Sequence, residues 1–404
     1  MKITKLSLVA IAAMTLTTGA MADVDMKIGG QAVVYYQTAD AGEADMFAEN
    51  SSAANAGLQL NANADIGNGF GLGFQGTALN TFGLEGNLVD NVMQVGGGDI
   101  SGETKANAGD YFAITKAYLT KQIANTTLKA GRQELPKSLS PLAFTEGWNV
   151  FKNTFDAIVA INSDIPDTTL VGAYVSRSNE HADLGSFTGL IGTSKETDTA
   201  QNNGAYMLTA ANKSIANTPI TASYYQLPGS DLSALWLDVK ANKLGPVDLA
   251  VQGGTIMNGA SGGKDTKSIG AKIAANLGGV DTSLAYSKVN NGDVPVFNLG
   301  TGVKTPLYTQ MVANQGAIRH DNNTFVLKAA MAAGPGKLTA QYGLTSDDSA
   351  AENDYNELDL IYTFKALGTD MLAAYVMQKA DNDTFAGGTD DTNNIIRVWS
   401  RYNF

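Results

Sequence analysis

The sequence predicts an all-β fold, a transmembrane antiparallel β-barrel of about 18 strands, from three observations. Residues 393–404 alternate apolar and polar side chains and end on the aromatic Phe404, as in a strand with one face on lipid and the other on water. Short and long connections take turns along nearly the whole chain. Charged residues make up only 16% of the sequence, which is low for a soluble surface and natural for a protein with a lipid-facing band.

Residues 1–22 are expected to be a signal peptide. Lys2 and Lys5 precede an apolar stretch, and Ala20 and Ala22 are the small residues that signal peptidase reads. A single anchoring helix needs about 20 apolar residues, and the threonines from Thr15 onward interrupt this stretch too early. The mature chain would be one barrel domain, residues 23–404, exported to the outer membrane of a Gram-negative bacterium.

Alternation and turn residues place the expected strands in order along the chain. They cover residues 24–38, 53–66, 69–83, 109–123, 126–133, 153–162, 168–176, 204–214, 218–226, 231–242, 246–257, 266–276, 279–288, 323–333, 336–345, 354–365, 368–380 and 393–404. Two of them, 168–176 and 368–380, look apolar on both faces, so the face that meets lipid stays open there. A water-soluble sandwich or solenoid would alternate too, but the three observations above count against it.

The connections between these strands alternate in length. Tight ones occur at 67–68, 125, 164–167, 216–217, 244–245, 277–278, 334–335 and 367–368, and longer ones at 39–52, 84–108, 134–152, 177–203, 258–265, 289–322, 346–353 and 381–392. Outer-membrane barrels have short periplasmic turns and long extracellular loops, so the same arrangement is expected. Residues 227–230 are short where a long loop is due, which would mark a cut-down loop or a miscounted pair.

Charged residues within the strands are expected to face the lumen. A lysine near the bilayer midplane would cost about 2 to 4 kcal/mol on the lipid face. The expected lumen wall comprises Lys116, Lys129, Lys272, Lys328, Arg397, Arg401, Glu357 and Asp359. Such charges either select ions or only hydrate the wall and pair locally.

The connection 134–152 is the best candidate for a constriction of the pore. Its apolar residues, among them Leu142, Trp148 and Phe151, are expected to pack on the inner wall or over the outer rim, and the sequence leaves both open. Charged residues in and around it give the candidate constriction residues Glu134, Glu146, Asp156, Arg132 and Lys152.

Three segments resemble the OprD-type porins and the major outer-membrane porins of campylobacter-like (epsilonproteobacterial) bacteria. They are AGRQELPKSLSPLAFTEGWNVFKNTFDA at 130–157, IPDTTLVGAYVSR at 165–177 and NIIRVWSRYNF at 394–404. The resemblance implies a barrel of about 18 strands whose third long loop folds into the lumen, opposite basic wall residues that guide small solutes. It implies Glu134, Glu146 and Asp156 as the acidic side, and Arg132, Lys129, Arg397 and Arg401 as the basic side. The chain departs from the family in having few arginines, which favours a general porin over a channel for basic amino acids.

The expected function is a water-filled channel for passive diffusion of ions and small hydrophilic solutes, because barrels of about 16 to 18 strands leave an aqueous pore. The candidate constriction acids would give it a modest cation preference. The alternative is a surface adhesin or receptor that uses the barrel as an anchor and binds through the connections 84–108, 177–203 and 289–322.

Expected partners are outer-membrane lipid and lipopolysaccharide, the barrel-assembly machinery, and further copies in a homotrimer, which the sequence does not distinguish from a monomer. Tyr402 and Phe404 are the candidate residues for the membrane interface and for assembly. The formal net charge is −12, or −14 after the two lysines of the signal peptide are removed, and this acidity argues against nucleic acid.

No cofactor, metal or catalytic activity is expected. The chain lacks cysteine, and its two histidines, His181 and His320, lie in long connections without a catalytic motif. Residues 96–98 are glycines without the lysine of a phosphate loop. Loop acids such as Asp381 and Asp383 could hold calcium, but they lack EF-hand spacing and are expected to be solvated.

Overall fold

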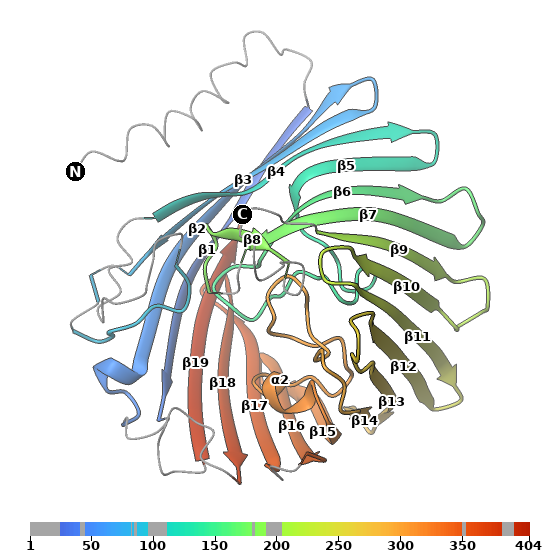
Figure 1. Ribbon diagram of the computed structural model, residues 1–404. Coiled ribbons are helices and arrows are strands. Elements are labelled where there is room, and N and C mark those ends of the chain that lie inside the picture. Colours follow the sequence, from blue (N-terminus) through green and yellow to red (C-terminus); the bar gives the residue numbers. More distant parts are fainter. Residues whose placement is uncertain are drawn as a thin grey trace.

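A computed structural model describes residues 25–40, 45–81, 83–84, 87–95, 111–179, 182–190, 204–349, 353–381 and 392–404. The expected signal peptide lies outside these ranges. Within them, eighteen antiparallel strands follow one another around a ring, and β1 (Asp25–Ala39) pairs with β19 (Thr392–Asn403) to close the sheet (Figure 1). The prediction of a closed antiparallel β-barrel of about 18 strands is confirmed. Among the described residues, no helix has the length and hydropathy needed to cross a bilayer.

Each expected strand corresponds to one barrel strand, with its ends within three residues. Between β1 and β19 these are β2 (Ser52–Gly67), β3 (Phe70–Asn80), β4 (Tyr111–Ile123), β5 (Thr126–Gln133), β6 (Phe155–Asn162), β7 (Thr168–Asn179), β9 (Ala205–Asn212), β10 (Ile220–Leu227), β11 (Leu232–Leu244), β12 (Val247–Asn258), β13 (Thr266–Leu277), β14 (Val280–Val289), β15 (Asn322–Ala333), β16 (Gly336–Asp347), β17 (Tyr355–Ala366) and β18 (Thr369–Ala380). Outside the ring lie the short strand β8 (Phe187–Gly189), the 3-10 turn η2 (Glu49–Ser51) and the helix α2 (Gln315–Ile318).

The connections sort onto two rims, here named the short-turn rim and the long-loop rim. Tight hairpins at the short-turn rim need the left-handed backbone region, which Asn68, Asn217 and Gly278 supply with φ of 54°, 59° and 62°. The connection at 227–230 is a short hairpin on the long-loop rim, because β10 and β11 pair directly from Leu227 to Leu232. It is therefore a cut-down loop and the strand count is correct.

The pairing of β1 with β19, here called the seam of the barrel, extends to Phe404. The backbone N–H of Gly30 donates to the Phe404 oxygen at 2.8 Å, and the Phe404 N–H donates back at 3.1 Å. A Cβ at Gly30 would collide with the Phe404 ring, so glycine makes room for the terminal aromatic. The rings of Tyr402 and Phe404 lie 5.9 Å apart and are about half exposed on the outer surface beside the seam.

The inner face of the barrel is apolar in places, and this explains the two strands that look apolar on both faces. Val171 and Val175 of β7 point inward and are buried in a core that includes residues of the long loops. Leu372 and Val376 of β18 are buried in the same way against Val312. Long loops therefore lie inside the ring and cover part of its inner wall.

Candidate functional site

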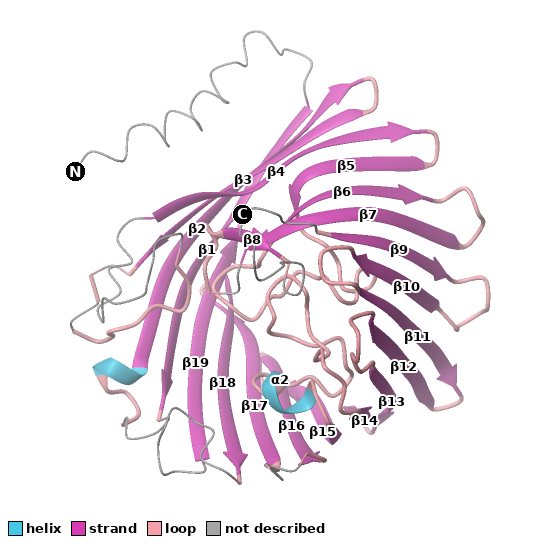
Figure 2. Ribbon diagram, in the orientation of Figure 1, coloured by secondary structure: helices cyan, strands magenta, loops and turns pink. Residues whose placement is uncertain are grey.

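Two long loops that the structure describes in full enter the barrel, residues 134–154 between β5 and β6 and residues 290–321 between β14 and β15. They occupy the inside of the ring of strands in Figure 2. The N–H of Leu299 donates to the oxygen of Leu142 at 2.8 Å, which joins the loops to each other. Leu142 also packs with the inward wall residues Tyr225 and Trp236. The lumen is therefore narrowed by two interlocked loops.

Loop 134–154 crosses to the opposite wall, where two arginines of β19 hold its backbone. Arg397 Nη1 donates to the Trp148 oxygen at 2.9 Å. Arg401 donates to the oxygens of Val150 and Asn149, both at 2.7 Å. Arg397 and Arg401 were expected to line the lumen wall, and the structure places them between that wall and the loop.

Glu146 lies in the contact between the two loops, and this differs from its expected place at a water-filled constriction. Its side chain is only 5% exposed. Its Oε1 accepts hydrogen bonds from Asn298 Nδ2 at 2.7 Å, Thr301 Oγ1 at 2.5 Å and the Lys304 N–H at 3.1 Å. Because loop 290–321 covers the carboxylate, it serves as an acceptor for that loop rather than as an exposed charge.

Glu357 and Asp359 of β17 point inward as expected, but loop 290–321 covers them. Glu357 Oε1 accepts from the N–H of Ala313 at 2.8 Å, and Asp359 Oδ2 accepts from the N–H of Val312 at 3.2 Å. Both side chains are at most 1% exposed. The pair satisfies donors of the loop and offers no charge to lumen water.

Lys304 is the cation at the centre of loop 290–321. Its Nζ donates to the oxygens of Val312 and Met311 and to Gln315 Oε1, at 2.5, 3.3 and 3.0 Å. The side chain is 7% exposed, and burial lowers its pKa to about 8 although Glu146 and Glu357 oppose the shift.

This pKa predicts a pH dependence of stability. Unfolding returns Lys304 to water, where its pKa is 10.5, so the unfolded chain binds the proton more tightly than the folded chain. The charge opposes folding at neutral pH, and stability is expected to rise as the pH goes from about 8 towards 10.5. In Lys304→Met this part of the rise should disappear from heat-denaturation midpoints measured between pH 7 and pH 10. The exposed Lys264→Met is the control, and equal profiles for both variants would contradict the assignment.

Arg132 and Asp156, expected at the constriction, lie on the outer face near the long-loop rim. Arg132, Asp156 and Arg177 are in register on β5, β6 and β7. They share the face of Ile158, which is 59% exposed on the outside. Asp156 pairs with Arg132 at 2.9 Å and with Arg177 at 2.7 Å, and the Arg132 guanidinium lies 3.3 Å from the Phe187 ring centroid.

Glu134 is brought together with two lysines on the lumen side. Its oxygens lie 2.5 Å from Lys116 Nζ and 3.4 Å from Lys152 Nζ. Burial favours the neutral acid, but the two lysines outweigh it and hold the pKa of Glu134 below its usual value. The carboxylate is therefore charged and compensated, and the cluster as a whole is cationic.

Lys129, Lys272 and Lys328 point into the barrel without a carboxylate partner. Their chain neighbours Leu128, Ile273 and Leu327 are exposed on the outer face, which puts the three lysines on the inner face. Among the described residues no carboxylate oxygen lies within ion-pair distance of any of the three. They are positive charges along the inner wall that take part in no ion pair of the described residues.

A further pair of inward-facing charged residues, Asp238 and Lys240 on β11, was not among the residues predicted from the sequence. Their charged atoms are 3.6 Å apart, and the Tyr308 hydroxyl of loop 290–321 donates to Asp238 Oδ2 at 2.6 Å. Burial and this hydrogen bond raise the pKa of Tyr308. The alternation with the outward Leu235 and Leu237 could have identified both residues.

The residues considered for catalysis or metal binding do not converge. His320 Nε2 lies 2.6 Å from the backbone oxygen of Gly292 inside loop 290–321. His181, Asp383 and the glycines 96–98 lie outside the described residues. In the part of the chain that the structure describes, no three histidine or acidic side chains form a cluster that could hold a metal.

No protein-family model and no curated protein matches the chain. Solved structures do, and three from Pseudomonas aeruginosa each match 94% of this chain and 98% of their own. OccK8 (OprE) has 14% identity and a TM-score of 0.76. OpdK with vanillate has 14% and 0.74, and OccK2 (OpdF) in complex with glucuronate has 13% and 0.72. At these identities the likeness establishes the fold, a closed antiparallel barrel with eighteen strands in its ring.

Proposed function

We propose that the chain forms an outer-membrane channel for passive diffusion of ions and small hydrophilic solutes in a Gram-negative bacterium. The closed ring carries the proposal, because exposed apolar side chains cover its outside while lysines project into its interior. A barrel of about 16 to 18 strands is wide enough for a water-filled pore. OpdK, one of the similar proteins, is an outer membrane protein, and the OprD-type resemblance of the sequence agrees with this likeness.

The expected cation preference loses its support at three positions. Glu146 is buried, Asp156 lies on the outer face between two arginines, and Glu134 is compensated by two lysines. Lys272 and Lys328 remain as inner-wall charges that form no ion pair among the described residues. We therefore propose a preference for anionic solutes, since fixed charges at a low-dielectric wall concentrate counter-ions. Vanillate and glucuronate, found with two of the similar proteins, are both carboxylates.

Reconstitution of the folded barrel into planar bilayers tests the proposal. We expect stepwise ohmic conductance, and in a potassium chloride gradient a reversal potential of the sign that anion flux gives. Protein denatured before addition is the control. Folded protein that gives no conductance steps would contradict the channel, and a reversal potential of the opposite sign would contradict the anion preference alone.

One of the three long connections that suggested an adhesin or receptor is not available on the surface. Loop 290–321 packs inside the barrel against loop 134–154, so most of it is withdrawn from a surface partner. Cleavage of the signal peptide, recognition by the assembly machinery through Tyr402 and Phe404, a homotrimer, and the likeness to porins of campylobacter-like bacteria remain predictions.

A further inference from the structure

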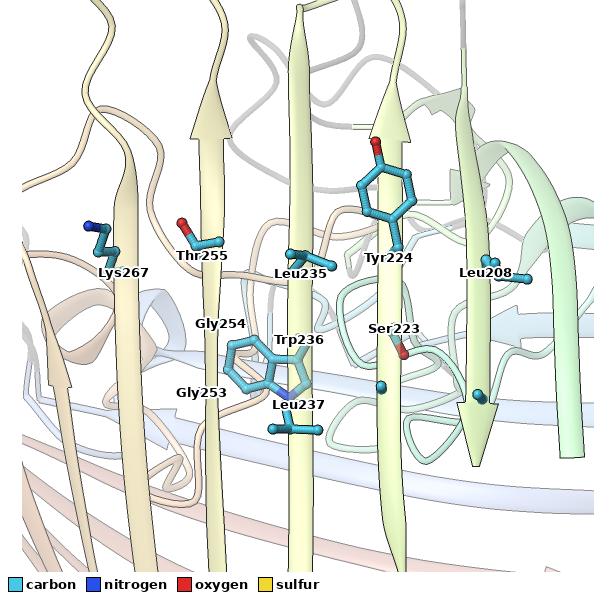
Figure 3. A pocket seen from close by; sticks show the side chains of 12 residues that line it. Leu208, Ser223, Tyr224, Leu235, Trp236, Leu237, Gly253, Gly254, Thr255 and Lys267 are labelled. Carbon is cyan, nitrogen blue, oxygen red and sulfur yellow. The ribbon is translucent and has the colours of Figure 1, made fainter. Parts of the chain in front are cut away.

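A hollow of about 610 Å³ lies in the outer wall of the barrel, over strands β9 to β13. Two rows of outward residues form it. The row nearer the long-loop rim is Leu208, Tyr224, Leu235, Thr255 and Lys267, seen across the strands in Figure 3. The row below is Ala210, Ala222, Leu237 and Gly253. Three of the four residues in this lower row are alanine or glycine. Their small side chains leave a shallow hollow in the outer wall, bordered on the long-loop side by the larger side chains of the first row.

The shape of the hollow suits an acyl chain, but shape alone selects no particular lipid. Leu208, Leu235 and Leu237 are each between 47% and 60% exposed, and they face outward where lipid is expected. Lipid tails are as apolar as leucine, so burying one tail in place of another gains packing and little else. A preference for one kind of lipid over another must therefore come from polar groups at the edge of the hollow.

Lys267 supplies such a group. It is the second residue of β13, it is exposed, and it forms no ion pair within the described ranges. In Figure 3 its amine points towards the long-loop end, as does the hydroxyl of Tyr224, which donates to Gln226 Oε1 at 2.7 Å. The paired rings of Tyr174 and Tyr206 lie one outward position nearer the long-loop rim, where Tyr206 is in register with Gln226. Tyrosine and lysine at one level mark the headgroup region of a bilayer.

We propose that this face binds a phosphorylated glycolipid of the lipid A class, with one acyl chain in the hollow and a phosphate on the Lys267 ammonium. The assignment rests on the proposed function, which puts the long-loop rim at the outer leaflet. A phosphate neutralises Lys267 at the membrane interface. A second barrel packed on this face would instead bury the ammonium against an apolar wall, which is unfavourable without a partner.

Binding of purified bisphosphorylated lipid A to the full barrel in detergent, measured by native mass spectrometry, tests the site. Lys267→Gln is expected to weaken binding about fivefold, the contribution of one lysine near an anionic lipid surface. Ala222→Leu fills the hollow and is expected to weaken binding by excluding the tail. Dephosphorylated lipid A should bind the wild type and Lys267→Gln equally weakly.

Lys365→Gln, at the short-turn rim, and Ala340→Leu, on the outer face of β16, are matched controls and should keep wild-type affinity. Unchanged binding to Lys267→Gln, or equal binding of both lipids to the wild type, would overturn the site. If Ala222→Leu alters only the size of the solubilised particle, the face is an interface between copies and the proposal is wrong. Conductance of the same preparations separates the two claims, because its absence rejects the channel and leaves the lipid result standing.

Discussion

Exchanging Lys272 and Lys328 for glutamate is expected to reverse the proposed ion preference of the channel, from anions to cations. The two side chains point into the barrel from β13 and β15, and neither forms an ion pair among the described residues. The exchange replaces two positive charges by two negative ones at a wall that faces a confined pore. The reversal potential in a potassium chloride gradient should change sign and move by on the order of tens of millivolts.

The control for this exchange is Lys365→Glu. Lys365 lies at the short-turn rim with a side chain that is 86% exposed, so the same change of charge meets bulk water. Its effect per charge should be much smaller. The shift in the lumen variants should also fall between about 0.1 M and 1 M salt, where the screening length drops from about 10 Å to about 3 Å. A lumen variant that keeps the wild-type reversal potential would place the selective charges elsewhere.

The strands were predictable because apolar and polar side chains alternate along most of them and turn residues follow each one. Both signals are local in the sequence. The phase of alternation was not predictable where both faces are apolar. In β6, Ile158 faces outward and Val159 faces loop residues inside the barrel, so neither side chain tells which way Asp156 points. The register of β5, β6 and β7 decides it, and register depends on pairing between strands.

The inward loops show the same limit. Apolar residues of loop 134–154 predicted that it packs on something, and loop 290–321 carries an equal signal in Val296, Phe297 and Leu299. The apolar residues of a loop do not indicate which strand or loop they pack against. The buried place of Glu146 depends on Asn298, 152 residues further along the chain, and only the closed barrel brings the two together.

Removal of the two arginine anchors, as Arg397→Gln with Arg401→Gln, is expected to free the far end of loop 134–154 and widen the pore. Three hydrogen bonds from guanidinium groups to the oxygens of residues 148–150, at 2.7 to 2.9 Å, would be lost. Hydrogen bonds from charged donors contribute about 1.5 to 3 kcal/mol each, and glutamine can replace part of this. A net loss of about 3 kcal/mol raises the population of the released loop about a hundredfold.

Trypsin measures this release, because Lys152 lies in the loop and its side chain is 58% exposed. Cleavage after Lys152 requires the segment to leave the wall, so its rate should follow the open population when opening is fast. The double variant should be cleaved about a hundredfold faster than the wild type, in line with the energy above. It should also show larger and noisier single-channel conductance.

Arg177→Gln separates anchoring from a general loss of arginine. Arg177 binds Asp156 on the outer face and touches no carbonyl of residues 148–150, so its variant should keep the wild-type cleavage rate and conductance. If the double variant is cleaved faster but conducts normally, the loop end is released without limiting ion flow, and the narrowest part of the pore lies at the contact between loops 134–154 and 290–321. If neither quantity changes, other contacts hold the loop and the arginines are not its anchors. These contacts are the apolar packing of Val150 and Phe151 on β1 and β3 and the two hydrogen bonds between the Phe151 backbone and the Gln94 side chain.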